Sequence, residues 1–283
     1  MLTALRRVML SQTSKLGQRY ASGAAKLVEV TKNDDNGISV ISMARKPVNG
    51  LNLELLTDLR EALLNAQKDG SAGVVLTSSL STVFSGGLDI MEMYKPDDTR
   101  VEKFWTTLQD TWMTLYGLGI PTTAAINGSS PAGGCLLAMS CEYRVMVDGK
   151  HTIGLNETRL GIVAPKWFMN TMIDIIGQRQ SEMALLRGTL FTPQEALKIG
   201  LIDEIVANKD QAVAKCSDFI EAFAGIPDRA RIATKMNLRG ERIAWLKKNR
   251  AEDIATFLGF VKDSQVQMGL DLYIQALKGK SKM

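Results

Sequence analysis

Residues 121–147, PTTAAINGSSPAGGCLLAMSCEYRVMV, decide the fold class of this chain of 283 residues. The segment begins with threonine and small apolar residues that predict a short strand, and a loop of small residues, SSPAGG, follows it. The apolar run after the loop predicts a helix, and YRVMV predicts another short strand. A strand, a glycine-containing loop and a helix in this order are typical of an α/β fold with a parallel sheet.

The segments on either side continue this pattern. Residues 27–43 alternate apolar and polar side chains around Asp35-Asn36-Gly37, which predicts a β-hairpin. The short β-branched run at 73–79 predicts a buried strand. Apolar residues at helical spacing predict helices over 52–70 and 101–118, and then over 181–201, 209–224, 227–248 and 250–278.

We expect three parts in the chain: a leader at 1–20, an α/β core at 21–220 and a helical C-terminal section at 221–283. The leader carries four basic residues and no acid, and its apolar residues can form one face of a helix. This composition is typical of a mitochondrial transit peptide and predicts a mature protein that begins near Ala21 and resides in the mitochondrial matrix. A disordered basic tail is the alternative interpretation of the leader.

The composition argues against several classes of protein. The basic residues of the leader account for the whole net charge of +4, and the rest of the chain has no basic stripe with interleaved aromatics that would suggest nucleic-acid binding. The sequence contains no run of about 18 apolar residues, so it does not predict stable membrane insertion. The three cysteines lack metal-binding spacing and His151 is the only histidine, which argues against a zinc site and, with no GxSxG motif, against a serine hydrolase.

Three segments between the expected strands and helices could carry chemistry. FSGGLD at 84–89 and NGSSPAGGC at 127–135 are loops whose free N–H groups could bind a phosphate or an oxyanion, although loop glycines more often serve turns or packing. IGLNETRLGI at 153–162 places Glu157 among apolar residues, where burial would raise its pKa and suit it to proton transfer. A surface or helix-start acid paired with Arg159 is an equal alternative for Glu157.

In this order and at these spacings, the three segments resemble the enoyl-CoA hydratase/isomerase (crotonase) superfamily, and within it the double-bond isomerases. The resemblance runs from about residue 27 to the C-terminus and rests on VFSGGLDIMEM, NGSSPAGGCLLAMSCEYRVM and IGLNETRLGIVAP. Two departures are Gly86, where the family often has alanine, and a turn, DGKHT, that looks trimmed. The resemblance implies an α/β fold, a crotonase-like spiral of β-β-α units, followed by C-terminal helices that mediate a homotrimer.

The resemblance also implies which residues form the site. Glu157 would be the catalytic acid/base, and the backbone N–H groups of Leu88 and Gly133 would form an oxyanion hole for the thioester carbonyl. The substrate would be an acyl-CoA, and the reaction would need no metal and no cofactor beyond the coenzyme A that the substrate carries. The substrate-binding residues would be Gly86, Gly87, Leu88, Asp89, Ile90, Gly133 and Asn156.

These residues fit an isomerase that converts 3-enoyl-CoA, cis or trans, into 2-trans-enoyl-CoA in fatty-acid β-oxidation. One glutamate can remove a proton from C2 and return it to C4 while the oxyanion hole stabilises the dienolate. Hydratases of the superfamily hold water with a second glutamate, at a position that matches Leu136 here, and an apolar residue cannot orient water. Leu136 would also suit ordinary core packing. A hydratase and a noncatalytic acyl-CoA-binding protein are the alternatives.

Overall fold

The computed structural model describes residues 26–280, with side chains as far as residue 275, so the expected transit peptide at 1–20 lies outside the described residues. A six-stranded sheet has the strand order β1-β2-β3-β4-β6-β8. The predicted hairpin forms the antiparallel pair at one edge, and every later pairing is parallel. The predicted α/β class is therefore confirmed. The strands are β1 (Val28–Lys32), β2 (Ile38–Met43), β3 (Gly73–Ser78), β4 (Thr122–Ile126), β6 (Tyr143–Val147) and β8 (Glu204–Val206).

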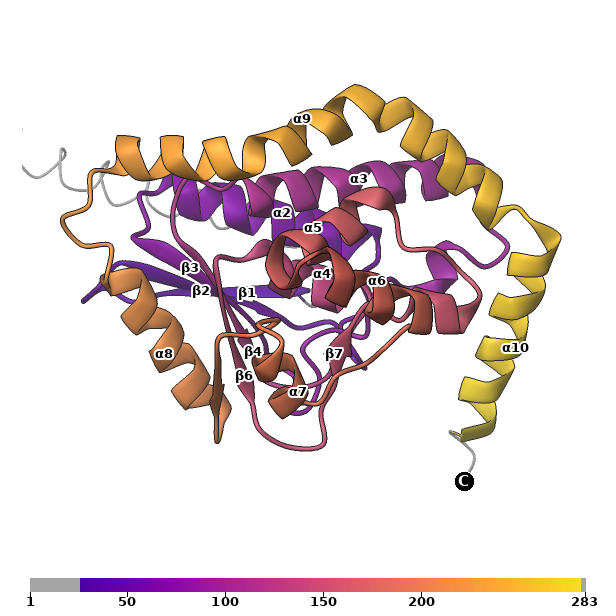
Figure 1. The fold of residues 1–283 in the computed structure, drawn as a ribbon, viewed down its shortest axis with the longest axis horizontal. Coiled ribbons are helices and arrows are strands. Elements are labelled where there is room, and N and C mark those ends of the chain that lie inside the picture. Colours follow the sequence, from indigo (N-terminus) through magenta and orange to yellow (C-terminus); the bar gives the residue numbers. More distant parts are fainter. Residues whose placement is uncertain (1–25, 281–283) are drawn as a thin grey trace, which may run out of the picture.

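Helices cover both faces of the sheet (Figure 1). On one face α8 (Lys209–Glu221) contacts β3, β4 and β6, and a small core forms around Val75 and Ala125. On the other face lie α2 (Leu53–Lys68) and α3 (Asp98–Tyr116), and the long helix α9 (Asp228–Val261) packs along α3. Every residue of β3 is buried because both faces of this strand are covered.

A second layer of short pairings connects the successive strand–helix units. Strand β5 (Ser130–Pro131) follows β4 and pairs in parallel with β7 (Ile153–Gly154), which follows β6. Single bridges extend this layer from Leu51 to Leu88 and from Val83 to Ser129. The units therefore form a spiral, and the loops after β3, β4 and β6 meet at the carboxyl ends of adjacent parallel strands, where α/β proteins usually bind ligands.

The remaining elements are η2 (Ile90–Glu92), α4 (Gly133–Ser140), η3 (Glu157–Leu160), α5 (Lys166–Ile176), α6 (Gln178–Arg187), α7 (Pro193–Lys198) and α10 (Ser264–Lys280). No helix within residues 26–280 is long and apolar enough to cross a membrane. In the same range, no group of His, Cys, Asp and Glu could hold a metal ion.

The C-terminal half differs in detail from the expected pattern. Helix α5 and strand β8 were not predicted, and the expected break near residue 249 is absent because α9 continues to Val261. The chain turns instead at Asp263, whose carboxylate accepts hydrogen bonds from the backbone N–H groups of Gln265 (2.8 Å) and Val266 (3.3 Å). Such a cap satisfies the free donors at the start of α10, so this polar residue and not the amphipathic period sets the break.

Candidate active site

One cavity lies where the three loops meet the C-terminal helix α10. The loops approach from the carboxyl ends of β3, β4 and β6, and α10 forms the remaining wall. Glu157 is the one carboxylate among the described residues that line the cavity. The lining residues are Gly86, Leu88, Ile90, Met93, Pro131, Ala132, Asn156, Glu157, Leu160, Ile162, Gly269, Leu270 and Tyr273.

Glu157 is a buried carboxyl group that has no ion-pair partner within residues 26–275. It is the first residue of η3, only 5% of it is exposed, and its Oε2 atom has no hydrogen-bond partner among the described residues. Burial raises the pKa of Glu157 from 4.5 to about 7. The Arg159 guanidinium donates instead to the carbonyl of Arg187 (3.1 Å). Glu157 therefore does start a helix, as one alternative expected, but it is neither a surface acid nor paired with Arg159.

This pKa leads to a prediction about the pH dependence of proton abstraction by Glu157. Only the ionised carboxylate can act as the base, so the rate rises with pH until the group is fully ionised. We expect kcat/KM to increase through a midpoint near pH 7, the raised pKa, and to level off above it. A pH–rate profile on an enoyl-CoA substrate measures this midpoint. A midpoint near the ordinary glutamate value of 4.5 would contradict the assignment.

In the first loop, the backbone hydrogen bonds leave one N–H group free. The N–H groups of residues 84 and 85 donate to the carbonyl of Ser129, that of Gly86 to Val48, and that of Gly87 to the Ser85 hydroxyl. The N–H of Asp89 donates to the carbonyl of Leu51 (3.0 Å). Among the described residues, the N–H of Leu88 has no acceptor. Leu88 is half-buried and lines the cavity, so its free N–H can bind an oxygen from a ligand.

In the second loop, a strained turn places Gly133 beside Leu88. Ala132 has φ 50° and ψ −120°, an uncommon conformation for a residue with a Cβ atom, and Gly133 is the first residue of α4. The N–H of Ala132 donates to Gly154 (2.8 Å) and its carbonyl accepts from Leu136 (3.0 Å), so the turn is held on both sides. A Cβ atom on Gly133 would lie 3.3 Å from the Leu88 nitrogen. Two donors, one of them at the positive end of a helix, therefore lie side by side.

Comparison with known proteins identifies the family. The family model for enoyl-CoA hydratase/isomerase matches residues 33–282. The chain belongs to the enoyl-CoA hydratase/isomerase family. It is 43% identical over 286 residues to enoyl-CoA delta isomerase 1, mitochondrial, of Rattus norvegicus, with 99% of both chains covered. It is 39% identical over 244 residues to the Homo sapiens protein of the same name, with 86% of this chain and 80% of the human protein covered.

Solved structures of this family agree with the fold. The crystal structure of human mitochondrial delta3-delta2-enoyl-CoA isomerase superposes with a TM-score of 0.87 at 38% identity, covering 90% of this chain and 99% of that one. An enoyl-CoA hydratase from Bacillus halodurans has a TM-score of 0.78 at 24% identity, covering 87% and 100%, and shows the shared fold alone. The predicted crotonase-like fold is therefore confirmed.

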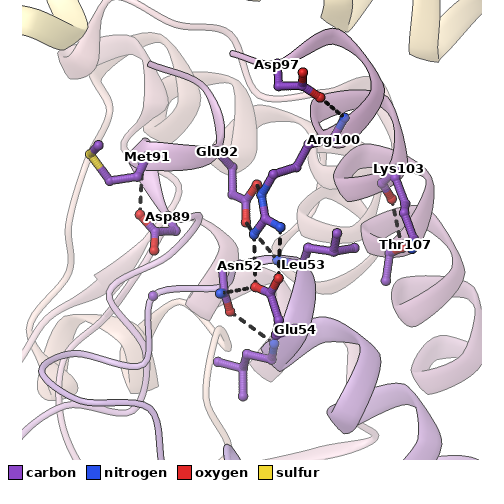
Figure 2. A network of polar contacts seen from close by, with 12 residues as sticks. Asn52, Leu53, Glu54, Asp89, Met91, Glu92, Asp97, Arg100, Lys103 and Thr107 are labelled. Atoms are coloured by element: carbon purple, nitrogen blue, oxygen red, sulfur yellow. Dashed lines mark hydrogen bonds and ion pairs between the residues drawn. The ribbon is translucent and has the colours of Figure 1, made fainter. Parts of the chain in front are cut away.

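The other residues that the family resemblance implies for the site differ in whether they line the cavity. Gly86, Ile90 and Asn156 line the cavity, and the buried side-chain oxygen of Asn156 has no hydrogen-bond partner among the described residues. The side chain of Asp89 is occupied elsewhere. Its carboxylate pairs with Arg45 (2.6 Å) and accepts the N–H of Met91 (2.9 Å; Figure 2). Gly87 and Gly133 are buried and are not among the residues that line the cavity, although the N–H of Gly133 is one of the two donors.

The wall formed by α10 was not predicted from the family motifs. Leu270 and Tyr273 face the cavity, and α10 is fastened to the segment after the first loop. The hydroxyl of Tyr94 donates to Asp271 (2.6 Å), and the side-chain amide of Gln267 accepts the N–H of Lys95 (2.9 Å). The amphipathic pattern of the C-terminal section predicts a helix, but it contains no signal for the loop that this helix covers.

Proposed function

We propose that this chain is an enoyl-CoA delta isomerase that converts 3-enoyl-CoA, cis or trans, into 2-trans-enoyl-CoA in fatty-acid β-oxidation. The observation that carries the proposal is that buried Glu157 is the single carboxylate among the described residues lining a cavity that Leu88 also lines, and that the Gly133 N–H lies next to Leu88. The rat and human relatives, which bear the name of this activity, support it. Coenzyme A enters as part of the substrate, and the chemistry requires neither a metal nor a redox cofactor.

The proposed reaction is a proton transfer between two carbons of the substrate. The C2 protons of a 3-enoyl thioester are acidic because the thioester and the alkene both stabilise the carbanion. Glu157 removes one of them, and the negative charge of the dienolate develops on the thioester oxygen. The N–H groups of Leu88 and Gly133 donate to this oxygen, each worth roughly 3–4 kcal/mol in a dry site. The protonated Glu157 then returns the proton to C4, which re-forms the carboxylate and leaves the double bond between C2 and C3.

The single carboxylate favours isomerisation over hydration. Addition of water across C2 and C3 requires a group that holds the water while another group supplies the proton, and the resemblance implies two glutamates for this task. Leu136, at the position of the second glutamate, is fully buried in the main hydrophobic core. An apolar surrounding also keeps the dienolate dry, which strengthens its hydrogen bonds to the oxyanion hole.

Replacement of Leu136 by glutamate tests this distinction. We expect Leu136→Glu to raise the ratio of hydration to isomerisation, because a second carboxyl group could hold a water molecule. We also expect lower total activity and a lower Tm, because burying a carboxyl group without prepared partners costs several kcal/mol. The measurement is both rates on one preparation of each protein, with Leu136→Met as the apolar control. A ratio that is the same in all three proteins would show that position 136 does not select the reaction.

A direct assay separates the proposed enzyme from a noncatalytic acyl-CoA-binding protein. The product, 2-trans-enoyl-CoA, is a conjugated thioester with its own ultraviolet absorption, so its formation from 3-cis- and 3-trans-enoyl-CoA can be followed continuously. We expect turnover at a typical enzymatic rate, on the order of 1–10³ s⁻¹. Binding of the substrate without formation of the conjugated product would reject the enzyme and favour the binding protein.

We also propose that the mature protein forms a homotrimer in the mitochondrial matrix. The relatives named above are mitochondrial proteins, and the acid-free leader supports import. The C-terminal helices leave large apolar side chains exposed, among them Leu238 on α9 and Met268 and Leu272 on α10. We expect analytical ultracentrifugation to give three times the mass of one chain, or a multiple of that. A stable monomer at micromolar concentration would contradict the trimer.

A further inference from the structure

The hydroxyl of Ser85 lies at the centre of the first loop, fully buried, although it does not line the cavity. Its Oγ atom donates to the carbonyl of Asn49 (2.8 Å) and accepts the N–H of Gly87 (3.2 Å). This second bond determines which donor remains free. Because Ser85 engages the N–H of Gly87, the N–H of Leu88 is the one left for a ligand.

Ser85 is held by a rigid partner. Asn49 is fully buried and has φ 49°, a left-handed conformation that asparagine tolerates better than most residues. Its side-chain amide donates to the hydroxyl of Ser78 (2.7 Å) and to the carbonyl of Phe84 (3.0 Å). The carbonyl that accepts from Ser85 is therefore fixed to the end of β3 and to the residue that precedes Ser85.

Ser85 also lies against the second loop. A Cβ atom on Gly134 would lie 2.7 Å from the carbonyl oxygen of Ser85, so the two loops pack without space for a methyl group. The carbonyl of Ser129 accepts the N–H groups of Phe84 (3.0 Å) and Ser85 (3.3 Å). Ser85 therefore influences both the direction of the Leu88 N–H and its spacing from the Gly133 N–H.

The segment that follows the first loop is held by contacts that do not involve Ser85. The carboxylate of Glu92, at the end of η2, accepts the N–H of Leu53 (3.0 Å) and pairs with Arg100 (2.6 Å; Figure 2). Arg100 also binds Glu54 in α2 with two hydrogen bonds of 2.9 Å. Loss of the Ser85 hydroxyl would leave these contacts in place, so its effect would be confined to the residues between Ser85 and Leu88.

We infer that Ser85, which donates a hydrogen bond to the carbonyl of Asn49, is a positioning residue that orients the Leu88 N–H toward the thioester oxygen. This inference rests on the proposed isomerase function. Ser85 acts through the backbone and touches no reacting atom. Its contribution belongs to the transition state, in which the oxygen carries charge, and much less to the binding of the neutral substrate.

The test compares Ser85→Ala with Ser39→Ala, assayed on 3-enoyl-CoA. Ser39 in β2 is also buried and shares one hydrogen bond with the Ser71 hydroxyl (2.8 Å), far from the loop, so it controls for the loss of a buried hydroxyl. We expect kcat of Ser85→Ala to fall about tenfold or more with KM within about threefold, because small misplacements of catalytic donors are costly. We expect kcat of Ser39→Ala to stay within about twofold of wild type.

A second readout reports on the oxyanion hole without turnover. Acetoacetyl-CoA has an acidic central methylene group, and its enolate carries charge on the thioester oxygen and absorbs in the near ultraviolet. We expect the bound enolate to form about one pH unit higher in Ser85→Ala than in wild type, which corresponds to a tenfold weaker preference for the charged form. If Ser85→Ala does not fold, Ser85→Cys, with a weaker donor of similar size, is judged by the same two measurements.

The outcomes separate this inference from the proposed function. A folded Ser85 variant with kcat within twofold of wild type and an unshifted enolate titration would overturn the positioning role alone. An equal loss of kcat in Ser85→Ala and Ser39→Ala would also overturn it, because any buried hydroxyl would then have the same effect. A wild-type protein that does not isomerise 3-enoyl-CoA would reject the proposed function itself.

Discussion

Replacement of Glu157 by glutamine is expected to lower kcat at least about 10²-fold while KM changes little, because a positioned general base is worth roughly 10²–10⁴-fold. Glutamine has nearly the same shape, so the cavity that Glu157 shares with Asn156 and Leu88 survives the change. No other carboxylate among the described lining residues could take over the proton. The measurement is steady-state kinetics on 3-enoyl-CoA above pH 7, where the wild-type carboxyl is ionised.

Thermal unfolding provides the control for this variant. Burial raises the pKa of Glu157 in the folded state, so the folded protein binds the proton more tightly than the unfolded chain. The stability that this proton contributes is present below pH 4.5 and is lost as the pH rises toward 7. The Tm of Glu157→Gln relative to wild type should therefore increase between pH 5 and pH 8.

A matched variant at a second, partly buried glutamate should behave in the opposite way. Glu142 pairs with Arg231 (3.1 Å) and Lys235 (2.6 Å), away from the cavity. Glu142→Gln should lower the Tm, because two cations lose their partner, while kcat stays close to wild type. If Glu157→Gln keeps more than about a tenth of the wild-type kcat, another group moves the proton and the mechanism is wrong.

Replacement of Gly133 by alanine is expected to lower kcat by about 10²–10³-fold, the effect of losing one oxyanion-hole donor. The added Cβ atom would lie 3.0 Å from Leu51 Cδ1, 3.1 Å from Leu88 Cδ2 and 3.3 Å from the Leu88 nitrogen. The methyl group therefore pushes the two donors apart. Gly259→Ala on α9, where nothing lies within 4 Å of the new Cβ atom, is the control and should keep its kcat. Equal rates for the two variants would show that the Leu88–Gly133 pair does not bind the oxyanion.

Much of the fold was predictable from local patterns. The hairpin around Asp35-Asn36-Gly37 and the helix that became α2 have clear periodicity and turn residues, and both are confirmed. Strand β8 has only three residues, too few for an alternating pattern to show, and it forms by pairing with β6 at the sheet edge. The break between α9 and α10 depends on a single capping residue, Asp263, which a search for amphipathic period does not detect.

The candidate site was predictable only in part, because its properties depend on contacts between distant segments. Glu157 could be found in its apolar segment, but its burial depends partly on Leu270, more than a hundred residues away in sequence. The free N–H of Leu88 follows from hydrogen bonds that its neighbours make to Val48 and Leu51. The family motifs identify which residues matter, and the long-range contacts explain why.

The central claim is that the protein is an isomerase because it has one buried carboxylate and no second carboxylate to hold a water molecule. Two rates measured on one preparation of the wild-type protein test this claim most directly. The first is the conversion of 3-enoyl-CoA into 2-trans-enoyl-CoA, and the second is the hydration of crotonyl-CoA, both near pH 8, where Glu157 is ionised. Glu157 and the buried Leu136 predict isomerisation that is at least about 10²-fold faster, the usual worth of one positioned acid/base group. Hydration at a rate comparable to isomerisation would contradict the account and identify the protein as a hydratase.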